Sequence, residues 1–385
     1  MIIIYSLSFM VLVIKYKDVK YLIFYCVSLA SLITIIVLTR IIYKRANKLI
    51  TNNMCMLLSV GFIIISRLSF EKAVRQYLIV MLSVIVTSFI PYIITKGPFF
   101  SKLKWTYAIL GLVALACVLI FSVATNGAKI SFTILGVTFQ PSEIVKLLFV
   151  FAIASFFAKA EGIKDLIVIT IISALHVLIL VISKDLGGAV ILFIVYLCVM
   201  YVATCNVLYL TSGLIICSIG SIIGYKLFSH VRVRVNAFID PFDCIDNAGY
   251  QIAQSLFAIC SGGLFGMGLS EGMPKTIPVV AADFIYSAIS EEFGTIFSAC
   301  TILICISCFV MFMNIAMKFD NHFYKYVAVG LGILYIFQVF LTVGGVTKFI
   351  PLTGVTLPLV SYGGTSVLVT VIMFSIIQGL YIGRE

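Results

Sequence analysis

Long apolar stretches alternate with short polar links along most of the chain, and this pattern predicts a bundle of membrane-spanning helices. A helix needs about 20 mostly apolar residues to cross the hydrocarbon of a bilayer. No stretch has the apolar–polar alternation of an outer-membrane barrel strand. The predicted fold class is therefore all-α. The pattern predicts twelve helices, at residues 1–14, 21–43, 54–66, 77–95, 105–124, 141–158, 166–182, 187–203, 207–228, 284–317, 326–348 and 355–382.

Two polar stretches are too irregular to be simple links. Residues 230–282 form a link far longer than the connections usual in compact domains. Aromatic and aliphatic residues occur throughout it, so we expect an ordered, functional loop. A second irregular stretch, at residues 126–140, is expected on the same side of the membrane. The helix predicted from residue 284 is long, and we expect it to be tilted or partly outside the membrane.

Composition agrees with a membrane protein and points to anionic partners. The chain is 62% hydrophobic and 11% charged, whereas soluble domains are about 25% charged. Its net charge is +11, and most Lys and Arg residues lie in the links between apolar stretches. Lipid head groups are therefore the expected partners, and not nucleic acid. A membrane substrate that bears phosphate would match the same charge.

Charged side chains within the apolar stretches are candidate functional residues, because charge is costly inside a membrane. Glu143 and Lys146 are three positions apart and share a helix face. They form either a structural ion pair or a site in which Lys146 meets an anionic substrate and Glu143 holds it. Asp185, followed by two glycines, is either a helix cap or a carboxylate that faces the site or a metal.

The ends of the long loop carry further candidates. Arg232 and Arg234 follow a predicted helix and suit a lipid phosphate or pyrophosphate, although they could serve only as interfacial anchors. Asp283 lies where the loop re-enters the membrane. It is either a helix cap or a general base, since an apolar boundary raises the pKa of a carboxyl. Glu291 and Glu292 lie about two turns further along the helix, and at least one is expected to be neutral or paired.

Residues 351–366 contain too many Pro and Gly residues for a regular helix. Non-helical backbone at membrane depth is tolerated where protein buries it or where it lines a cavity. This stretch is therefore expected to be a re-entrant segment lining a site, with a kinked structural helix as the alternative.

These stretches occur in the order and rough spacing of motifs in the SEDS family of cell-wall polymerases, the FtsW/RodA/SpoVE group, which the chain resembles over about residues 54–383. Residues 139–146 resemble the FQPSE-x-x-K motif of that family, and residues 283–294 resemble its DFIF…EE-x-G run. Several long motifs in order argue strongly against coincidence. Further matching stretches are residues 67–76, 184–188, 230–251, 254–268 and 353–366.

The resemblance implies an architecture. It predicts a ten-helix membrane core at residues 54–383, preceded by about two helices at residues 1–53 that lie outside the family core. It predicts a protein of the bacterial plasma membrane with its N-terminus on the cytoplasmic side. It places residues 229–283 in an extracytoplasmic loop. The chain has Thr342 at a position where the family frequently has Asn.

The resemblance also implies a function. The family polymerises glycan strands from lipid II at the outer face of the membrane and works with a class B penicillin-binding protein. Its key carboxylate falls on Asp283. The leaving pyrophosphate would need cations or a divalent ion such as Mg²⁺ or Mn²⁺. The alternative functions are a lipid II flippase and a catalytically silent scaffold for the penicillin-binding protein. The expected substrate-binding residues are Lys129, Glu143, Lys146, Asp185, Arg232, Arg234, Gln254, Ser255 and Ser361.

Overall fold

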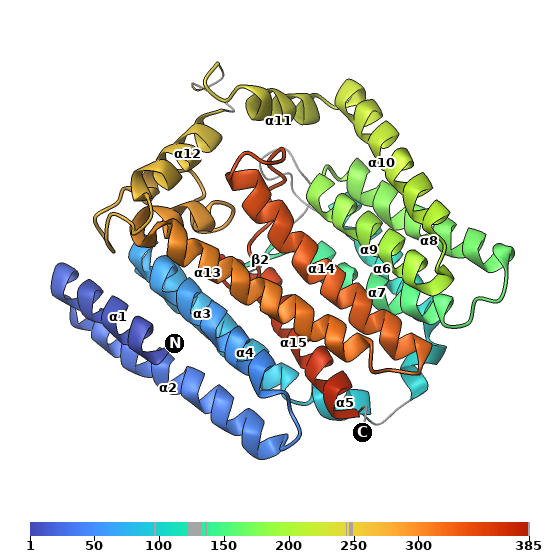
Figure 1. Ribbon diagram of the computed structural model, residues 1–385, viewed down its shortest axis with the longest axis horizontal. Coiled ribbons are helices and arrows are strands. Elements are labelled where there is room, and N and C mark those ends of the chain that lie inside the picture. Colours follow the sequence, from blue (N-terminus) through green and yellow to red (C-terminus); the bar gives the residue numbers. More distant parts are fainter. Residues whose placement is uncertain (96–97, 122–131, 135–136, 244, 246–248, 384–385) are drawn as a thin grey trace. The chain divides into compact units, whose positions relative to one another are not determined.

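The computed structural model describes residues 1–95, 98–121, 132–134, 137–243, 245 and 249–383, and most of them are helical (Figure 1). Nine helices in these ranges are long and apolar enough to cross a membrane. The predicted all-α fold class is confirmed. The longer helices are α1 (Ile2–Tyr16), α2 (Val19–Ile42), α3 (Lys48–Leu68), α4 (Phe70–Thr87), α6 (Lys104–Phe121), α7 (Pro141–Phe157), α8 (Ile163–Ile182), α9 (Leu186–Thr204), α10 (Val207–Leu227), α11 (Ser229–Ile239), α12 (Tyr250–Gly262), α13 (Ile285–Ala316), α14 (His322–Val346) and α15 (Gly364–Gly383).

Shorter elements lie in the links. Helix α5 (Ile90–Thr95) follows α4, and the 3₁₀ helices η1 (Pro98–Lys102) and η2 (Pro274–Thr276) lie in the links before α6 and α13. Strands β1 (Phe132–Ile134) and β2 (Val137–Phe139) pair in antiparallel fashion, with Phe132 opposite Phe139. The sequence predicted one helix over 77–95. The structure has two, because the chain turns before Pro91, a residue that suits the first turn of a helix.

The chain forms two compact units, and each is built from three separate stretches of sequence. Unit 1 comprises Met1–Val86, Ile222–Cys308 and Gln338–Gly363. Unit 2 comprises Thr87–Ser221, Phe309–Phe337 and Gly364–Glu385. The division between an N-terminal part, 1–53, and a membrane core, 54–383, stays a prediction.

In unit 1, α1 and α2 form a hairpin that packs against α3 (Figure 1). The Tyr5 hydroxyl on α1 and the Ser28 hydroxyl on α2 are 2.5 Å apart and buried. Helix α3 is buried over most of its length. Gly61 lets it approach a non-helical chain closely, because a Cβ atom at this position would lie only 2.7 Å from the carbonyl oxygen of Val360.

Helix α13 is interrupted at Gly294, where φ is 84° and ψ is 170°. Only glycine adopts such a backbone conformation readily. The helical stretch from Thr295 to Ala316 is by itself longer than the roughly 20 residues that cross a bilayer. That this long helix is tilted or lies partly outside the membrane stays a prediction.

In unit 2, α6 packs on α7, α8 on α9, and α5 on α15. Gly379 on α15 contacts Pro91, since a Cβ atom on Gly379 would lie 2.9 Å from the Cα atom of Pro91. On α6, Gly111 leaves room for the His176 imidazole of α8, whose Nε2 atom would lie 2.7 Å from a Cβ atom at residue 111. Close helix packing in this unit therefore depends on small residues.

One predicted helix boundary is wrong, and the long loop contains helices that sequence reasoning did not identify. The last helix, predicted from residue 355, begins at Gly364, because residues 351–363 are held in a non-helical path by side chains of other helices. The long loop at 229–283 was not predicted to contain helices, yet α11 and α12 lie within it. The prediction that this loop is ordered is confirmed for these two helices. Residues 351–363 are called the irregular segment below.

Candidate functional site

Asp283 lies at the end of a tight turn immediately before α13. The backbone N–H groups of Ala282 and Asp283 both donate to the carbonyl oxygen of Val279, over 3.0 and 3.3 Å. The turn fixes the direction in which the Asp283 side chain leaves the backbone. The side chain is partly buried.

Arg234 on α11 lies beside the same turn. Its Nη1 atom donates to the carbonyl oxygen of Thr353, over 3.1 Å. A Cβ atom on Gly354 would lie 3.7 Å from Oδ2 of Asp283 and 3.9 Å from Nη2 of Arg234. The carboxylate and the guanidinium therefore flank an exposed glycine, which has φ of +74°. The structure brings together Asp283, Arg234 and the irregular segment, three features that the sequence singled out separately.

Two opposing influences act on the pKa of the Asp283 carboxyl. Burial raises the pKa of the Asp283 carboxyl above its ordinary value, and the positive charge of Arg234 opposes that shift. A carboxyl group in such surroundings binds a proton more readily than one in water. Asp283 therefore has the environment of a general base beside a fixed cation.

Ser361 attaches the irregular segment to the Asp283 turn. Its hydroxyl donates to the carbonyl oxygen of Ala282 over 2.5 Å and accepts from the N–H of Leu357 over 2.9 Å. The N–H of Tyr362 donates to the carbonyl oxygen of Ala281 over 2.7 Å. The Ser361 hydroxyl is thus engaged on both sides and positions the backbone next to Asp283. Contact of Ser361 with substrate stays a prediction.

Two residues that sequence reasoning did not assign to the site hold the irregular segment in place. The Gln76 amide on α4 donates to the carbonyl oxygen of Ser361 over 3.0 Å and accepts from the N–H of Gly363 over 3.3 Å. On α14, the Thr342 hydroxyl donates to the carbonyl oxygen of Val355 over 2.9 Å. Both side chains are buried. The available signal for Gln76 was the match of residues 67–76 to a family motif.

Arg232 and Arg234 diverge. Both lie on α11, and residues two apart on a helix point in different directions. Arg234 reaches Thr353, whereas Arg232 is exposed. Sequence reasoning placed the two guanidinium groups together, but the helical backbone separates them. A role for Arg232 in binding substrate stays a prediction.

Gln254 and Ser255 lie on α12. Ser255 is fully buried, its hydroxyl lies 2.6 Å from that of Ser287, and it donates to the carbonyl oxygen of Val346 over 2.8 Å. It thereby ties α12 to α13 and α14. Gln254 is partly exposed. The structure gives Ser255 internal partners, and substrate contact by either residue stays a prediction.

Glu291 and Glu292 are buried on α13, and each has an internal partner. Nε of Arg67 donates to Oε1 of Glu292 over 2.8 Å. Oε1 of Glu291 accepts from the N–H of Met273 over 2.7 Å. The prediction that at least one of the two acids is paired is confirmed by the bond between Arg67 and Glu292.

The predicted site residues of unit 2 that the structure describes have partners within the protein. Nζ of Lys146 donates to Oε1 of Glu143 over 2.8 Å, and both side chains are buried. Asp185 caps α9, because its Oδ1 accepts from the N–H of Gly188 over 2.9 Å. Its Oδ2 accepts from the Ser142 hydroxyl over 3.2 Å. The structure thus contains the ion pair and the helix cap, and additional substrate roles stay predictions. Lys129 lies outside the described residues.

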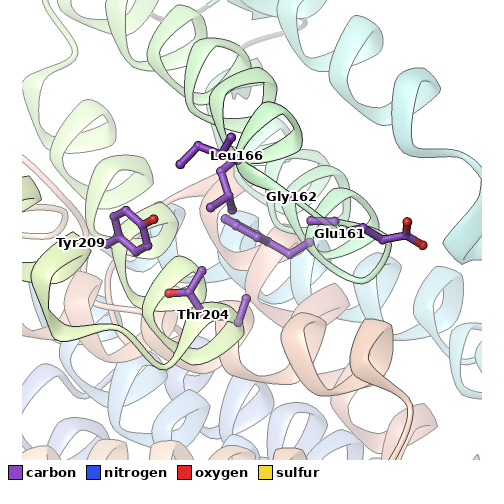
Figure 2. Close-up of a pocket in the computed structure, with 9 residues that line it drawn as sticks. Glu161, Gly162, Leu166, Thr204 and Tyr209 are labelled. Atoms are coloured by element: carbon purple, nitrogen blue, oxygen red, sulfur yellow. The ribbon is translucent and has the colours of Figure 1, made fainter.

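A cavity of about 260 Å³ lies elsewhere in unit 2, at the start of α8 and the end of α9 (Figure 2). Asp185 lies at the other ends of these two helices. Figure 2 shows the Tyr209 hydroxyl directed toward the centre of the view. None of the predicted site residues that the structure describes lines this cavity. The lining residues are Phe157, Ala160, Glu161, Gly162, Ile163, Leu166, Ala203, Thr204 and Tyr209.

Comparison with protein-family models decides the family. Residues 47–382 match the FtsW/RodA/SpoVE model, described as a cell cycle protein. The chain belongs to the FtsW/RodA/SpoVE family. The predicted family is therefore confirmed, and with it a multi-pass protein of the bacterial plasma membrane.

Relatives of this FtsW/RodA/SpoVE protein carry enzyme names. The "Peptidoglycan glycosyltransferase RodA" of Mycobacterium tuberculosis is 34% identical over 276 residues, which cover 68% of this chain and 59% of the relative. The chain thus spans less than two thirds of the length of these RodA relatives. The "Probable peptidoglycan glycosyltransferase FtsW" of Aliivibrio salmonicida is 30% identical over 353 residues, 86% of this chain and 85% of the relative.

Solved structures share the FtsW/RodA/SpoVE fold. A chain from a structure entitled "Structural coordination of polymerization and crosslinking by a peptidoglycan synthase complex" matches with a TM-score of 0.74 at 20% identity. RodA of Thermus thermophilus matches with a TM-score of 0.65, also at 20% identity. Each match covers 88% of this chain and 98% of the other. These likenesses establish the fold.

Proposed function

We propose that this protein is a peptidoglycan glycosyltransferase that polymerises lipid II into glycan strands at the outer face of the plasma membrane. The observation that carries the proposal is the Asp283 carboxylate beside the Arg234 guanidinium, across the exposed Gly354. The printed names of the RodA and FtsW relatives support the same reaction class. A lipid-linked substrate also matches the net charge of +11 on a membrane protein.

The proposed chemistry assigns one task to each group. Asp283 takes the proton from the acceptor hydroxyl as that oxygen attacks the anomeric carbon of the growing strand. Lipid pyrophosphate leaves with the electrons of the broken bond. Arg234 stabilises the charge that develops on it, because a guanidinium forms paired hydrogen bonds with phosphate oxygens. Ser361 and Gln76 keep the turn and the irregular segment in register.

A divalent ion, Mg²⁺ or Mn²⁺, would have few protein ligands here. Among the described residues, no group of three or more His, Cys, Asp or Glu side chains could hold a metal ion. Mg²⁺ often uses one or two carboxylates together with substrate phosphates. Asp283 and the pyrophosphate of the substrate fit that pattern. The ion would supply Lewis-acid stabilisation of the leaving group.

The proposed partner is a class B penicillin-binding protein. A chain of the same fold belongs to a peptidoglycan synthase complex that coordinates polymerization with crosslinking. Polymerisation supplies the strands that crosslinking consumes, so the two reactions are naturally coupled.

The test is polymerisation of labelled lipid II by the purified full chain, with and without the cognate penicillin-binding protein. Asp283→Asn should lower the rate of polymer formation by about 10²–10⁴-fold, the usual contribution of a general base. Asp243→Asn is the matched control, because Asp243 is an exposed acid in the same loop. Absence of polymer from the folded wild-type protein with its partner present would contradict the proposal. Equal activity of both variants would remove Asp283 from the mechanism.

A further inference from the structure

Three large apolar side chains are exposed at one bend of the loop before α13. Leu264 is 62%, Phe265 83% and Met267 48% exposed. We call residues 264–267 the loop tip. A compact group of exposed apolar side chains marks a contact with a membrane or another protein. None of these residues takes part in the site around Asp283.

Main-chain hydrogen bonds fix the loop tip on the interruption in α13. The N–H groups of Thr295 and Ile296 donate to the carbonyl oxygens of Gly263 and Leu264, over 2.9 and 3.3 Å. The N–H of Met267 donates in turn to the carbonyl oxygen of Glu291, over 2.9 Å. The interruption frees backbone groups of the helix, and the loop satisfies them. The exposure of the loop tip is therefore built into the backbone.

Gly266 and Gly294 make this insertion possible. A Cβ atom on Gly266 would lie 2.3 Å from the carbonyl oxygen of Glu292, and one on Gly294 would lie 2.3 Å from that of Leu264. Both glycines also have positive φ, of 85° and 84°. The two backbones can approach this closely only where neither residue carries a side chain.

Three helix ends place the loop at one boundary of the hydrocarbon, which is the outer one in the predicted topology with the N-terminus inside. The uninterrupted part of α13, which is long enough to cross the membrane, begins at Thr295, beside the loop tip. At the end of α3, Nη2 of Arg67 donates to the carbonyl oxygen of Gly272 over 3.0 Å. At the end of α1, Nζ of Lys15 donates to the carbonyl oxygen of Ser270 over 2.6 Å. Lys15 is partly exposed and can reach the lipid head groups, whereas Arg67 is buried and ties α3 to the loop.

The loop tip continues the lipid-facing side of α13. Ile296, whose N–H bonds to Leu264, is 50% exposed, and Leu303 further along α13 is 62% exposed. The side of a membrane helix that remains exposed faces the acyl chains of the bilayer. Lys15 and Glu271 form an ion pair beside the loop tip. These two charged side chains suit the polar head-group layer, which lies next to the acyl chains.

We propose that the loop tip is an interfacial anchor, in which Leu264, Phe265 and Met267 insert into the acyl-chain boundary of the outer leaflet. The anchor holds the loop that leads to Asp283 at the surface of the bilayer. It is independent of the proposed reaction, since it concerns where the loop lies and not what the site catalyses.

The test uses tryptophan fluorescence, because the chain has one Trp, Trp105. The full chain carrying Trp105→Phe receives Phe265→Trp, or Phe242→Trp as the control. Phe242 is also an exposed aromatic residue, 51% exposed, but it lies in an acidic turn next to Asp240 and Asp243. Each variant is placed in vesicles of phosphatidylethanolamine and phosphatidylglycerol whose acyl chains are brominated near the head group.

Brominated lipid should quench Phe265→Trp severalfold more strongly than Phe242→Trp, and aqueous acrylamide should do the reverse. Met267→Trp provides a second position if Phe265→Trp fails to fold, and it should behave like Phe265→Trp. Acrylamide quenching of the loop-tip variants equal to that of the control would overturn the proposal. That result would place the loop tip in water, as a surface for another protein.

Discussion

The charged groups around Asp283 in unit 1 and those around Lys146 in unit 2 are alike in type but differ in how they are satisfied. Asp283 and Arg234 flank an exposed glycine, and the Asp283 side chain is partly open. Glu143 and Lys146 are buried and bonded to each other. Charges that face an opening are available for chemistry, whereas charges that neutralise each other within a bundle stabilise its architecture. The same sequence signal, a charge in an apolar stretch, therefore has two physical outcomes.

The largest expected effect on stability concerns Lys146. Lys146→Met leaves the Glu143 carboxylate buried without its partner, and the free energy of unfolding should fall by about 3–5 kcal/mol. Thermal unfolding in detergent measures the loss. The double variant Glu143→Gln with Lys146→Met should recover much of it. A single variant as stable as the wild type would contradict a structural role for the pair.

Asp283→Asn should have the opposite effect to Lys146→Met, because it should lower activity without lowering stability. It removes a partly buried carboxylate with a raised pKa, so the protein should be at least as stable as the wild type while polymer formation falls. Unfolding and polymerisation are measured on the same preparation. A large loss of stability would place Asp283 among the structural charges.

The dependence of the polymerisation rate on pH should further distinguish Asp283 from the buried charges of unit 2. The base form of Asp283 is the carboxylate, and its raised pKa means that activity falls, as pH decreases, sooner than for an ordinary carboxyl. Arg234→Gln removes the opposing positive charge, so the pKa should rise further and the acidic limb should move to higher pH. Rates of polymerisation measured as a function of pH test this. Movement of the limb to lower pH would contradict the assignment.

A smaller effect is expected at Asp185. Asp185→Ala removes the cap of α9 and should lower the free energy of unfolding by about 1 kcal/mol. Ser142→Ala, which leaves the bond to Gly188 intact, should cost less. Polymerisation assays on both variants then show whether Asp185 has a role beyond capping. Activity lost without loss of stability would assign it one.

Sequence reasoning predicted most of the membrane helices, because a long apolar stretch is visible in the local sequence. It also selected Asp283 and Arg234, each from charge at a membrane boundary. It could not predict that Gln76 holds Ser361 and Gly363, because that bond joins residues far apart in the chain. The separation of Arg232 and Arg234 was missed because a short helix within a polar loop has no clear apolar period.

The interruption of α13 was hidden for a related reason. Gly294 follows Phe293 after a run of helix-compatible residues, and an isolated glycine within a helical pattern does not by itself indicate a break. The break is stable only because residues 263–268 supply hydrogen bonds from an earlier part of the chain. Local sequence reports that a glycine permits a bend, whereas tertiary structure decides whether the bend occurs.

Gln76 has a broader consequence. Its side-chain amide donates to one backbone carbonyl group and accepts from a backbone N–H two residues further on. A residue of a neighbouring β-strand would offer the same two bonds. A single side chain on a helix of this membrane protein thus replaces one residue of a sheet edge, and an open edge could not exist where lipid surrounds it. A designer who wishes to place a non-helical segment inside a membrane protein could graft such a glutamine onto a facing helix.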